Sequence, residues 1–283
     1  MELGPINSTD VEQVAAFLGA QLRSGVSAAA WSAAMAQRWV DDAPNHGFLL
    51  RRGEEIVGAY LAFYSEREID GRVERFCNLG AWCVLEAYRS HGLRLIRAML
   101  AQRGYTFTDL SPSGNVVALN KRLRFTSLDT ATALVPNLPW PTPSRGMTIT
   151  SDPAVIGAAL SGRDRQIFHD HQTAAAARHI LVTDGDESCY IILRHDRRKR
   201  LPIFGSILYV SNPGLFHRAA PLISRHLLVR HRVLATLAEL RVVSRRPPAS
   251  IMLRNPRPKM YRSDHVAADQ VDYLYSELTS VAW

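Results

Sequence analysis

The stretch AWCVLEAYRSHGLRLI, residues 81–96, decides the fold class of this chain. An apolar run ends at Val84, a short polar segment follows, and apolar residues recur at helical spacing from Gly92 onward. Such a strand-loop-helix presents backbone N–H groups at the start of a helix, which suits an anion such as a pyrophosphate. Gly92 has no Cβ to keep a phosphate at a distance, and Arg89 can donate charge-assisted hydrogen bonds.

Helices and a strand meander are expected before this stretch. Apolar residues at steps of three and four predict two helices within residues 10–40. Aliphatic and aromatic runs predict three strands, at residues 47–51, 56–64 and 75–84. Asp70-Gly71, between the second and third strands, indicates a tight hairpin, because a type I′ turn needs two residues at positive φ.

The segment after residue 96 completes one unit and leads into a break. We expect a strand at residues 105–110, a helix at 115–123 and a strand at 125–134. Residues 136–143, PNLPWPTP, contain four prolines, which neither a helix nor a central strand accommodates. This segment is interpreted as a linker between domains 1–138 and 139–283, or alternatively as a rigid surface loop of one domain.

The second half repeats the order of element types found in the first. Helices are expected at residues 153–160, 164–177 and 215–229, and strands at 180–183, 189–193, 203–210, 233–237 and 271–278. A basic turn is expected at 195–200, and residues 254–262 are interpreted as a solvated basic loop or a binding loop for an anion. The fold class is therefore α/β, with a mixed, mostly antiparallel central sheet flanked by helices in each of two domains.

Composition narrows the classes of function. The formal charge of the 283 residues is +8, and only three of the basic residues are lysines. The arginine excess reflects either codon bias or affinity for polyanions, and its even spread argues against a nucleic-acid partner. The three cysteines show neither zinc-site nor redox-pair spacing, which predicts no metal site, reduced thiols and a cytoplasmic location. The sequence lacks an apolar run of about 18 residues, so no membrane span is expected.

Residues 81–96 resemble the cofactor motif of the GNAT superfamily of N-acetyltransferases, Arg/Gln-x-x-Gly-x-Gly/Ala after an apolar strand. Arg89 and Gly92 match the first two key positions, and Arg94 stands where the family usually has glycine or alanine. The resemblance covers about residues 10–135. In the second half, residues 211–218 lack the Arg-x-x-Gly arrangement, which implies that this copy is degenerate.

A second family segment, Asn-x-x-Ala-x-x-Leu-Tyr-x-x-x-Gly-Phe, resembles residues 113–125. Asn120 takes the position of the tyrosine that protonates the departing thiolate in many members, and Arg124 takes that of the glycine. An amide does not ionise in this range, so Asn120 is expected to hydrogen-bond the cofactor instead of acting as an acid.

The resemblance implies two GNAT-like domains and an acyltransferase that moves an acetyl or other short acyl group from acyl-coenzyme A to an amine. Acetyl-coenzyme A or another acyl-coenzyme A would be the cosubstrate, with no metal, and the acceptor would be a small-molecule or peptide amine. The residues expected at the cofactor are Trp82, Cys83, Val84, Arg89, Ser90, His91, Gly92, Leu93, Arg94 and Asn120.

The catalytic residues are not identified by these motifs. The candidates are Glu74, which directly precedes the strand predicted at residues 75–84, Asn78 within that strand, and Asn120. Glu74 and Asp109 are the carboxylates near the expected base position, with a surface role as the alternative for each. Cys77 is interpreted as a small buried side chain, as is Cys83. Two other functions stay open, a transferase dependent on aminoacyl-tRNA and a non-catalytic binding protein with this fold.

Overall fold

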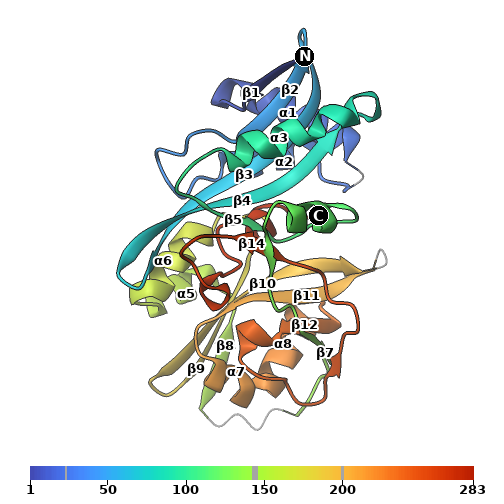
Figure 1. Ribbon diagram of the computed structural model, residues 1–283. Coiled ribbons are helices and arrows are strands. Elements are labelled where there is room, and N and C mark those ends of the chain that lie inside the picture. Colours follow the sequence, from blue (N-terminus) through green and yellow to red (C-terminus); the bar gives the residue numbers. More distant parts are fainter. Residues whose placement is uncertain (23, 142–145, 199–200) are drawn as a thin grey trace. The chain divides into compact units, whose positions relative to one another are not determined.

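The chain forms two compact units, each built on one sheet. The computed structural model describes residues 1–22, 24–141, 146–198 and 201–283. Unit 1 consists of Met1–Leu128, Pro258–Val271 and Tyr275–Trp283, and unit 2 of Asp129–Arg257 and Asp272–Leu274. Each unit has a seven-stranded mixed sheet, mostly antiparallel and flanked by helices, so the predicted fold class is confirmed (Figure 1).

The sheet of unit 1 has the order β1-β2-β3-β4-β5-β14-β6. Its neighbouring strands are antiparallel, except for β4 and β5, which are parallel. The strands are β1 (Glu2–Pro5), β2 (Gly47–Arg52), β3 (Glu55–Ile69), β4 (Arg72–Val84), β5 (Thr106–Asp109), β6 (Thr126–Ser127) and β14 (Met260–Arg262). The α-helices are α1 (Val11–Gln21), α2 (Ala28–Ala36), α3 (Gly92–Leu100), α4 (Val116–Arg122) and α10 (Glu277–Ser280), and the 3-10 helices are η1 (Ser8–Asp10), η2 (Glu86–His91) and η3 (Ala268–Gln270).

Strand β3 shows how this sheet is covered on both faces. Ala59, Leu61 and Phe63 pack into a cluster with α1 and α2. Tyr60 and Ala62 belong to a second cluster, which includes the buried face of α3. Successive side chains of a strand point to opposite faces, so a strand that is apolar at every position is buried between two helical layers.

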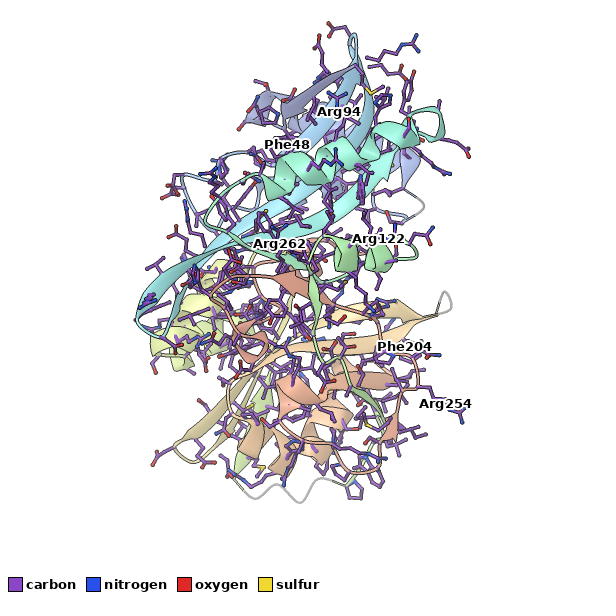
Figure 2. All side chains as sticks on the ribbon, in the orientation of Figure 1. Phe48, Arg94, Arg122, Phe204, Arg254 and Arg262 are labelled. Atoms are coloured by element: carbon purple, nitrogen blue, oxygen red, sulfur yellow. The ribbon has the colours of Figure 1, made fainter. Side chains whose placement is uncertain are left out.

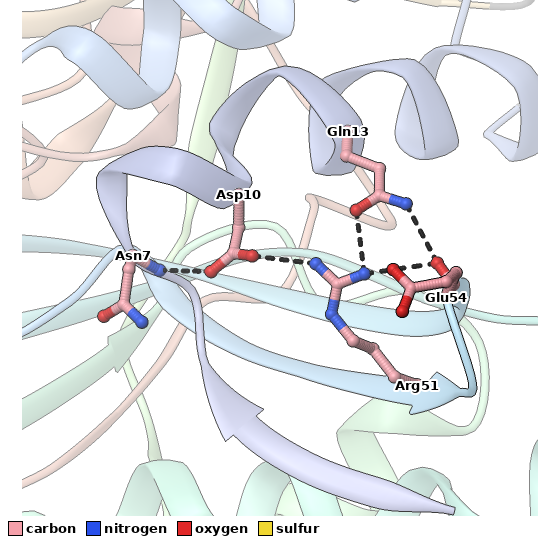
Figure 3. A network of polar contacts seen from close by, with 5 residues as sticks. All are labelled: Asn7, Asp10, Gln13, Arg51 and Glu54. Carbon is pink, nitrogen blue, oxygen red and sulfur yellow. Dashed lines mark hydrogen bonds and ion pairs between the residues drawn. The ribbon is translucent and has the colours of Figure 1, made fainter.

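A polar network ties the start of α1 to the β2–β3 hairpin (Figure 3). Arg51 on β2 donates to Asp10 Oδ1 at 2.7 Å and to Gln13 Oε1 at 2.8 Å. Gln13 and Arg51 both donate to the carbonyl of Glu54 in the turn, and Asp10 accepts the N–H of Asn7. The guanidinium thereby holds the first turn of the helix against β2 and the β2–β3 turn.

The predicted Asp-Gly hairpin between β3 and β4 is confirmed. Ile69 pairs with Arg72, and Asp70 and Gly71 adopt φ values of 51° and 73°. Both are positive, as a type I′ turn requires.

Replacing Gly71 with alanine is expected to lower the free energy of unfolding by about 1–2 kcal/mol, because a Cβ is unfavourable in the left-handed region. The space around Gly71 is open, so no steric clash adds to this cost. Urea denaturation measures the effect, with Gly4→Ala as the control, since Gly4 is equally open and has no positive φ. Equal losses in the two variants would contradict the turn assignment.

The sheet of unit 2 repeats the strand arrangement, with the order β13-β7-β12-β11-β10-β9-β8 and one parallel pair, β11 with β12. Its strands are β7 (Thr132–Pro136), β8 (Met147–Thr150), β9 (Arg178–Asp184), β10 (Glu187–Arg198), β11 (Leu201–Val210), β12 (Ala235–Glu239) and β13 (Ile251–Met252). Its helices are α5 (Pro153–Ala159), α6 (Gly162–His171), α7 (Pro213–Arg218), α8 (Ala220–His231) and α9 (Leu240–Val243). The core on one face of this sheet is formed with α7 and α8.

Two strands, β7 and β14, lie in a sheet built mainly from the other half of the sequence. The segment predicted as one strand at 125–134 is two strands, of which β6 lies in the sheet of unit 1 and β7 in that of unit 2. Conversely, strand β14 comes from the second half of the sequence, within the segment interpreted as a basic loop, and pairs with β5 and β6 of unit 1. The prediction of a single strand at 125–134 is therefore wrong.

Other predicted elements differ in detail. Residues 271–278 are not a strand, because Ser276 caps the short helix α10 by accepting the N–H of Leu278. The predicted basic turn at 195–200 is wrong up to Arg198, where β10 continues, and its last two residues lie outside the described ones. The predicted proline-rich linker also extends beyond the described residues, at 142 and 143. Among the described residues, none of the helices has both the length and the apolar character needed to cross a bilayer.

Candidate functional site

Strands β4 and β5 run together for three residues and then diverge. Phe76–Asn78 of β4 pair with Thr106–Thr108 of β5, whereas residues 79–84 pair with β3 and with no other described strand. The opening is associated with a bulge in β4. Tyr60 faces Trp82 and Leu61 faces Gly80, so Ala81 is an extra residue, with φ 40°.

A cavity of about 210 Å³ lies at this opening. The bulge contributes Gly80, Ala81 and Trp82 to its wall, and the segment after β5 contributes Ser111 and its neighbours. Aromatic side chains from three other segments complete it, namely Trp31, Tyr60 and Trp283. Open strand edges with backbone polar groups, next to a hollow, are where this sheet can bind a ligand.

Asp109 is the carboxylate of this cavity. It ends β5, is 4 % exposed, and accepts a hydrogen bond from Asn120 Nδ2 on Oδ2 at 2.7 Å. Burial raises the pKa of Asp109 to about 6, although hydrogen bonds from Asn120 and from the Ser111 backbone oppose the rise. The surface role considered for Asp109 is therefore wrong, and its pKa suits a general base near neutral pH.

The three candidate catalytic residues lie in different environments. Glu74 is half-buried in the far part of the β3–β4 hairpin, six residues from Gly80 and so about 20 Å along the strand. Asn78 donates to Thr108 Oγ1 at 3.0 Å and accepts the N–H of Glu277 at 3.0 Å, which makes it a clamp between strands and α10. Asn120 is buried and reaches the cavity through Asp109.

The loop after β4 has its own hydrogen bonds. The 3-10 helix η2 leads directly into α3, and Tyr88 N–H donates to Leu85 O. Gly92 N–H donates to Arg89 O, so two backbone donors that the sequence suggested would be free are engaged. Cationic side chains surround η2 instead. Arg89 is largely exposed beside Glu86, and Arg52 Nη1 donates to Tyr88 Oη at 2.7 Å.

Gly92 brings two of the other predicted cofactor residues together. A Cβ on Gly92 would lie 3.5 Å from Val84 and 3.6 Å from Trp82, which is ordinary contact, and its φ is −56°. The protein itself therefore does not require glycine here. The Trp82 indole Nε1 is buried and has no hydrogen-bond partner among the described residues. Cys83 packs on the opposite face of the sheet, in the cluster with α1 and α2.

The remaining predicted cofactor residues lie on η2 and the first turn of α3. Ser90 and Leu93 are exposed and His91 is half-buried. The Arg94 guanidinium donates to the carbonyl of Met1 at 3.3 Å, so this side chain extends toward the start of β1 (Figure 2). The large residue at the third key position of the motif thus leaves the turn itself unobstructed.

The start of the corresponding helix in unit 2 differs from that of α3. Strand β11 has a similar irregularity, where Tyr209 faces Ile192 and Ile207 faces Leu193, leaving Leu208 between them. The helix that follows begins with Pro213, which has no N–H, and the side chain of Asn212 accepts the N–H of Leu215. The start of α7 therefore offers fewer donors to an anion than an uncapped helix would.

Backbone strain at Ala81 can be tested by substitution. Ala81→Val is expected to lower the free energy of unfolding by about 1–3 kcal/mol, since β-branched residues are disfavoured at positive φ. Ala81→Gly should be as stable as the native chain or more so. Urea denaturation compares the two variants, and equal stability would show that the bulge conformation is not held in solution.

Comparison with known proteins identifies the fold of this chain. No protein-family model matches the sequence, and no curated protein matches it either. Three solved structures align over nearly the whole chain. A GCN5-related N-acetyltransferase from Anabaena variabilis is 11% identical, with 92% of this chain and 72% of that chain covered and a TM-score of 0.57. At this level of similarity the chain shares the fold of these structures. This chain has the GCN5-related N-acetyltransferase fold.

Two further structures agree with this assignment. A GCN5-related N-acetyltransferase from Kribbella flavida is 13% identical, with 92% of this chain and 70% of that chain covered and a TM-score of 0.55. A Pyrococcus horikoshii protein assigned as an acetyltransferase is 12% identical, with 99% of this chain and 94% of that chain covered and a TM-score of 0.56. The GNAT fold predicted from residues 81–96 is therefore confirmed.

The sequence did not reveal the bulge, the cavity or the burial of Asp109. The bulge is a matter of cross-strand register, which no local pattern in β4 indicates. A signal for Asp109 was present, because it follows the strand-like residues 105–108 directly before the break at Ser111-Pro112. Polar residues at the carboxyl end of a parallel strand are common site residues in open sheets.

Proposed function

We propose that this chain is an N-acyltransferase, which moves an acetyl or other short acyl group from acyl-coenzyme A to an amine at the cavity of unit 1. The observation that carries the proposal is the opening between β4 and β5, with Asp109 buried in its wall and the bulge at Ala81 beside it. The GNAT fold of the chain supports the same class of reaction.

The chemistry needs a base, an electrophile and an acid. Asp109 accepts a proton from the ammonium group of the acceptor, and the free amine attacks the thioester carbonyl carbon. A C–N bond forms and the C–S bond breaks. The leaving thiolate takes up a proton from a proton donor, and the nitrogen of the new amide gives up its second proton, which restores that donor. Tyr60 is the phenol that lines the cavity, and burial raises its pKa above the ordinary value. It is proposed as the proton donor, in place of the amide of Asn120.

The residues around η2 suit a phosphorylated cosubstrate. Arg89 and His91 on η2 supply positive or ionisable groups, Arg52 at the end of β2 contacts Tyr88 of the same 3-10 helix, and Gly92 leaves room for close approach. Trp82 offers a buried indole N–H without a partner among the described residues. Coenzyme A would be held there mainly by side chains, since part of the backbone of η2 is already hydrogen-bonded.

The second unit is proposed to be a degenerate copy that supports the fold or shapes the acceptor cleft. The sequence predicts an acyl-coenzyme A domain at residues 1–138 and a degenerate domain at residues 139–283, whereas the units of the structure divide at Leu128 and residues 258–271 and 275–283 belong to unit 1. The degenerate character of unit 2 is supported by the start of α7. Pro213 has no N–H, and the side chain of Asn212 already accepts the N–H of Leu215, so neither Pro213 nor Leu215 offers a pyrophosphate a backbone donor.

Two measurements on the full chain test the proposal. Calorimetry with acetyl-coenzyme A and other short acyl-coenzyme A thioesters is expected to show binding, and release of free thiol in the presence of amines is expected to show turnover. Absence of binding by every thioester would refute the acyltransferase proposal. Binding without turnover toward any amine would favour the non-catalytic alternative.

A further inference from the structure

The cavity wall of unit 1 is rich in aromatic rings. Trp31 and Trp283 lie with ring centroids 5.9 Å apart, and Tyr60 stacks on Trp82 at 4.9 Å with an angle of 10° between the planes. All four side chains line the same cavity. Ring faces carry partial negative charge and attract both flat apolar groups and cations.

Carboxylates lie in and directly behind the cavity wall. Asp109 is its carboxylate, and Glu277 lies one hydrogen bond behind the wall, where its Oε1 accepts from Ser111 Oγ at 2.8 Å. The described lining residues include no lysine, arginine or histidine. An anionic group entering the cavity would therefore meet carboxylates and ring faces and would find no cationic partner.

The cavity is also small. Its volume of about 210 Å³ is below the range of about 300–1,000 Å³ that is usual for drug-sized ligands. Leu22, Leu79 and Val116 add apolar side chains to the lining, and Ser24, Ser111 and Ser113 add three hydroxyl groups, of which that of Ser111 already donates to Glu277. A strongly hydrated, polyhydroxylated acceptor would lose more hydrogen bonds to water than these few polar groups can replace.

We propose that the acceptor is a small primary amine that enters as an ammonium ion, has a flat hydrophobic body and carries no anionic group. The inference rests on the proposed acyltransferase function and names the acceptor class for the same cavity. Asp109 pairs with the ammonium group, and the rings of Trp31, Tyr60, Trp82 and Trp283 receive the body of the molecule.

Three amines test the proposal on the full chain. 2-Phenylethylamine has the proposed character, L-phenylalanine adds a carboxylate to it, and glucosamine keeps the ammonium group on a polar body. With acetyl-coenzyme A, kcat/KM for 2-phenylethylamine is expected to exceed that for each of the other two by at least about 100-fold, because like-charge contact and unpaired buried polar groups are both costly. Equal or better turnover of L-phenylalanine or glucosamine would overturn the proposal.

A tryptophan variant and its control test the aromatic wall. Trp283→Leu is expected to raise KM for 2-phenylethylamine by about 10-fold, within the range of a lost contact between aromatic rings, without changing KM for acetyl-coenzyme A. Trp140→Leu is the matched control, since Trp140 is 42 % exposed and lies in unit 2. An unchanged KM for the amine in Trp283→Leu would contradict the role of the ring.

Binding of the amines without cosubstrate separates the two proposals. Calorimetry that detects 2-phenylethylamine but not L-phenylalanine or glucosamine, with no acyl transfer to any of them, would favour the non-catalytic alternative and uphold the proposed ligand class of the cavity. Transfer to glucosamine or L-phenylalanine with no binding of 2-phenylethylamine would uphold the function and refute the acceptor class.

Discussion

Asp109→Asn is expected to lower kcat/KM for acyl transfer by about 10²–10⁴-fold, the usual contribution of a general base. The amide is close in shape to the carboxylate and can still accept the hydrogen bond from Asn120 Nδ2. The loss would therefore come from the missing base and not from a collapsed cavity. In the native chain, the rate should rise with pH through the pKa of Asp109, about 6, and this rise should be absent from the residual activity of the variant.

The same substitution is expected to stabilise the fold at neutral pH. Burial raises the pKa of Asp109 from an ordinary value near 4 to about 6, so the folded chain binds more protons than the unfolded chain between these two values. Stability therefore falls as pH rises from about 4 to 6, and the charged carboxylate costs on the order of 3 kcal/mol above pH 6. Asparagine removes that cost, so the melting temperature of Asp109→Asn should exceed the native value at pH 7.5.

Thiol-release assays between pH 5 and 9 and thermal unfolding at pH 5 and 7.5 measure both effects. Glu74→Gln is the control, because Glu74 lies outside the cavity and this variant should match the native chain in rate and stability. Full activity in Asp109→Asn would exclude Asp109 as the base. Reduced stability at pH 7.5 would show that its carboxylate is better solvated than its burial implies.

Gly92→Ala is expected to weaken acetyl-coenzyme A binding by at least about 10-fold while leaving the fold intact. The new Cβ would be in ordinary contact with Val84 and Trp82, and alanine favours a helix over glycine by about 1 kcal/mol. The melting temperature should therefore stay constant or rise. Loss of affinity without loss of stability would mean that glycine is kept for the approach of a ligand.

Gly92→Trp places a large side chain at the start of α3 and should abolish the binding of acetyl-coenzyme A. Calorimetry with acetyl-coenzyme A and thermal unfolding are measured on both variants, so that misfolding is separated from a blocked site. Native affinity in Gly92→Ala would refute close approach at this position. Native affinity in Gly92→Trp would move the cofactor site away from the start of α3 altogether.

Local sequence patterns determined several of the individual elements of this protein. The helical spacing before residue 40 gives α1 and α2, the run after Gly92 gives α3, and Asp70-Gly71 makes the hairpin. These features depend on contacts a few residues apart, such as the i to i+4 spacing of a helix or the positive φ of a turn. The stretch at residues 81–96 also indicated the GNAT fold, because a strand, loop and helix in that order with Arg89 and Gly92 is a local arrangement.

Tertiary structure alone decided the site. The bulge at Ala81 exists because β3 and β4 change register there, and the cavity exists because β5 pairs with only three residues of β4. The membership of β7 and β14 in the sheets depends on partners more than 90 residues away in the chain, Ala235–Glu239 for β7 and Thr106–Asp109 for β14. Such pairings are set by the packing of the whole fold, which short hydrophobic runs do not encode.

The opening stretch illustrates both sides of this division. Its sequence determined that a strand leads through a polar turn into a helix, because each part follows from nearest neighbours along the chain. The direction of Arg94 toward Met1 and the burial of Asp109 with Asn120 arise only when separate segments pack together. Burial sets the pKa of Asp109 and the shape of the cavity, and burial is a property of the assembled fold and not of any segment within it.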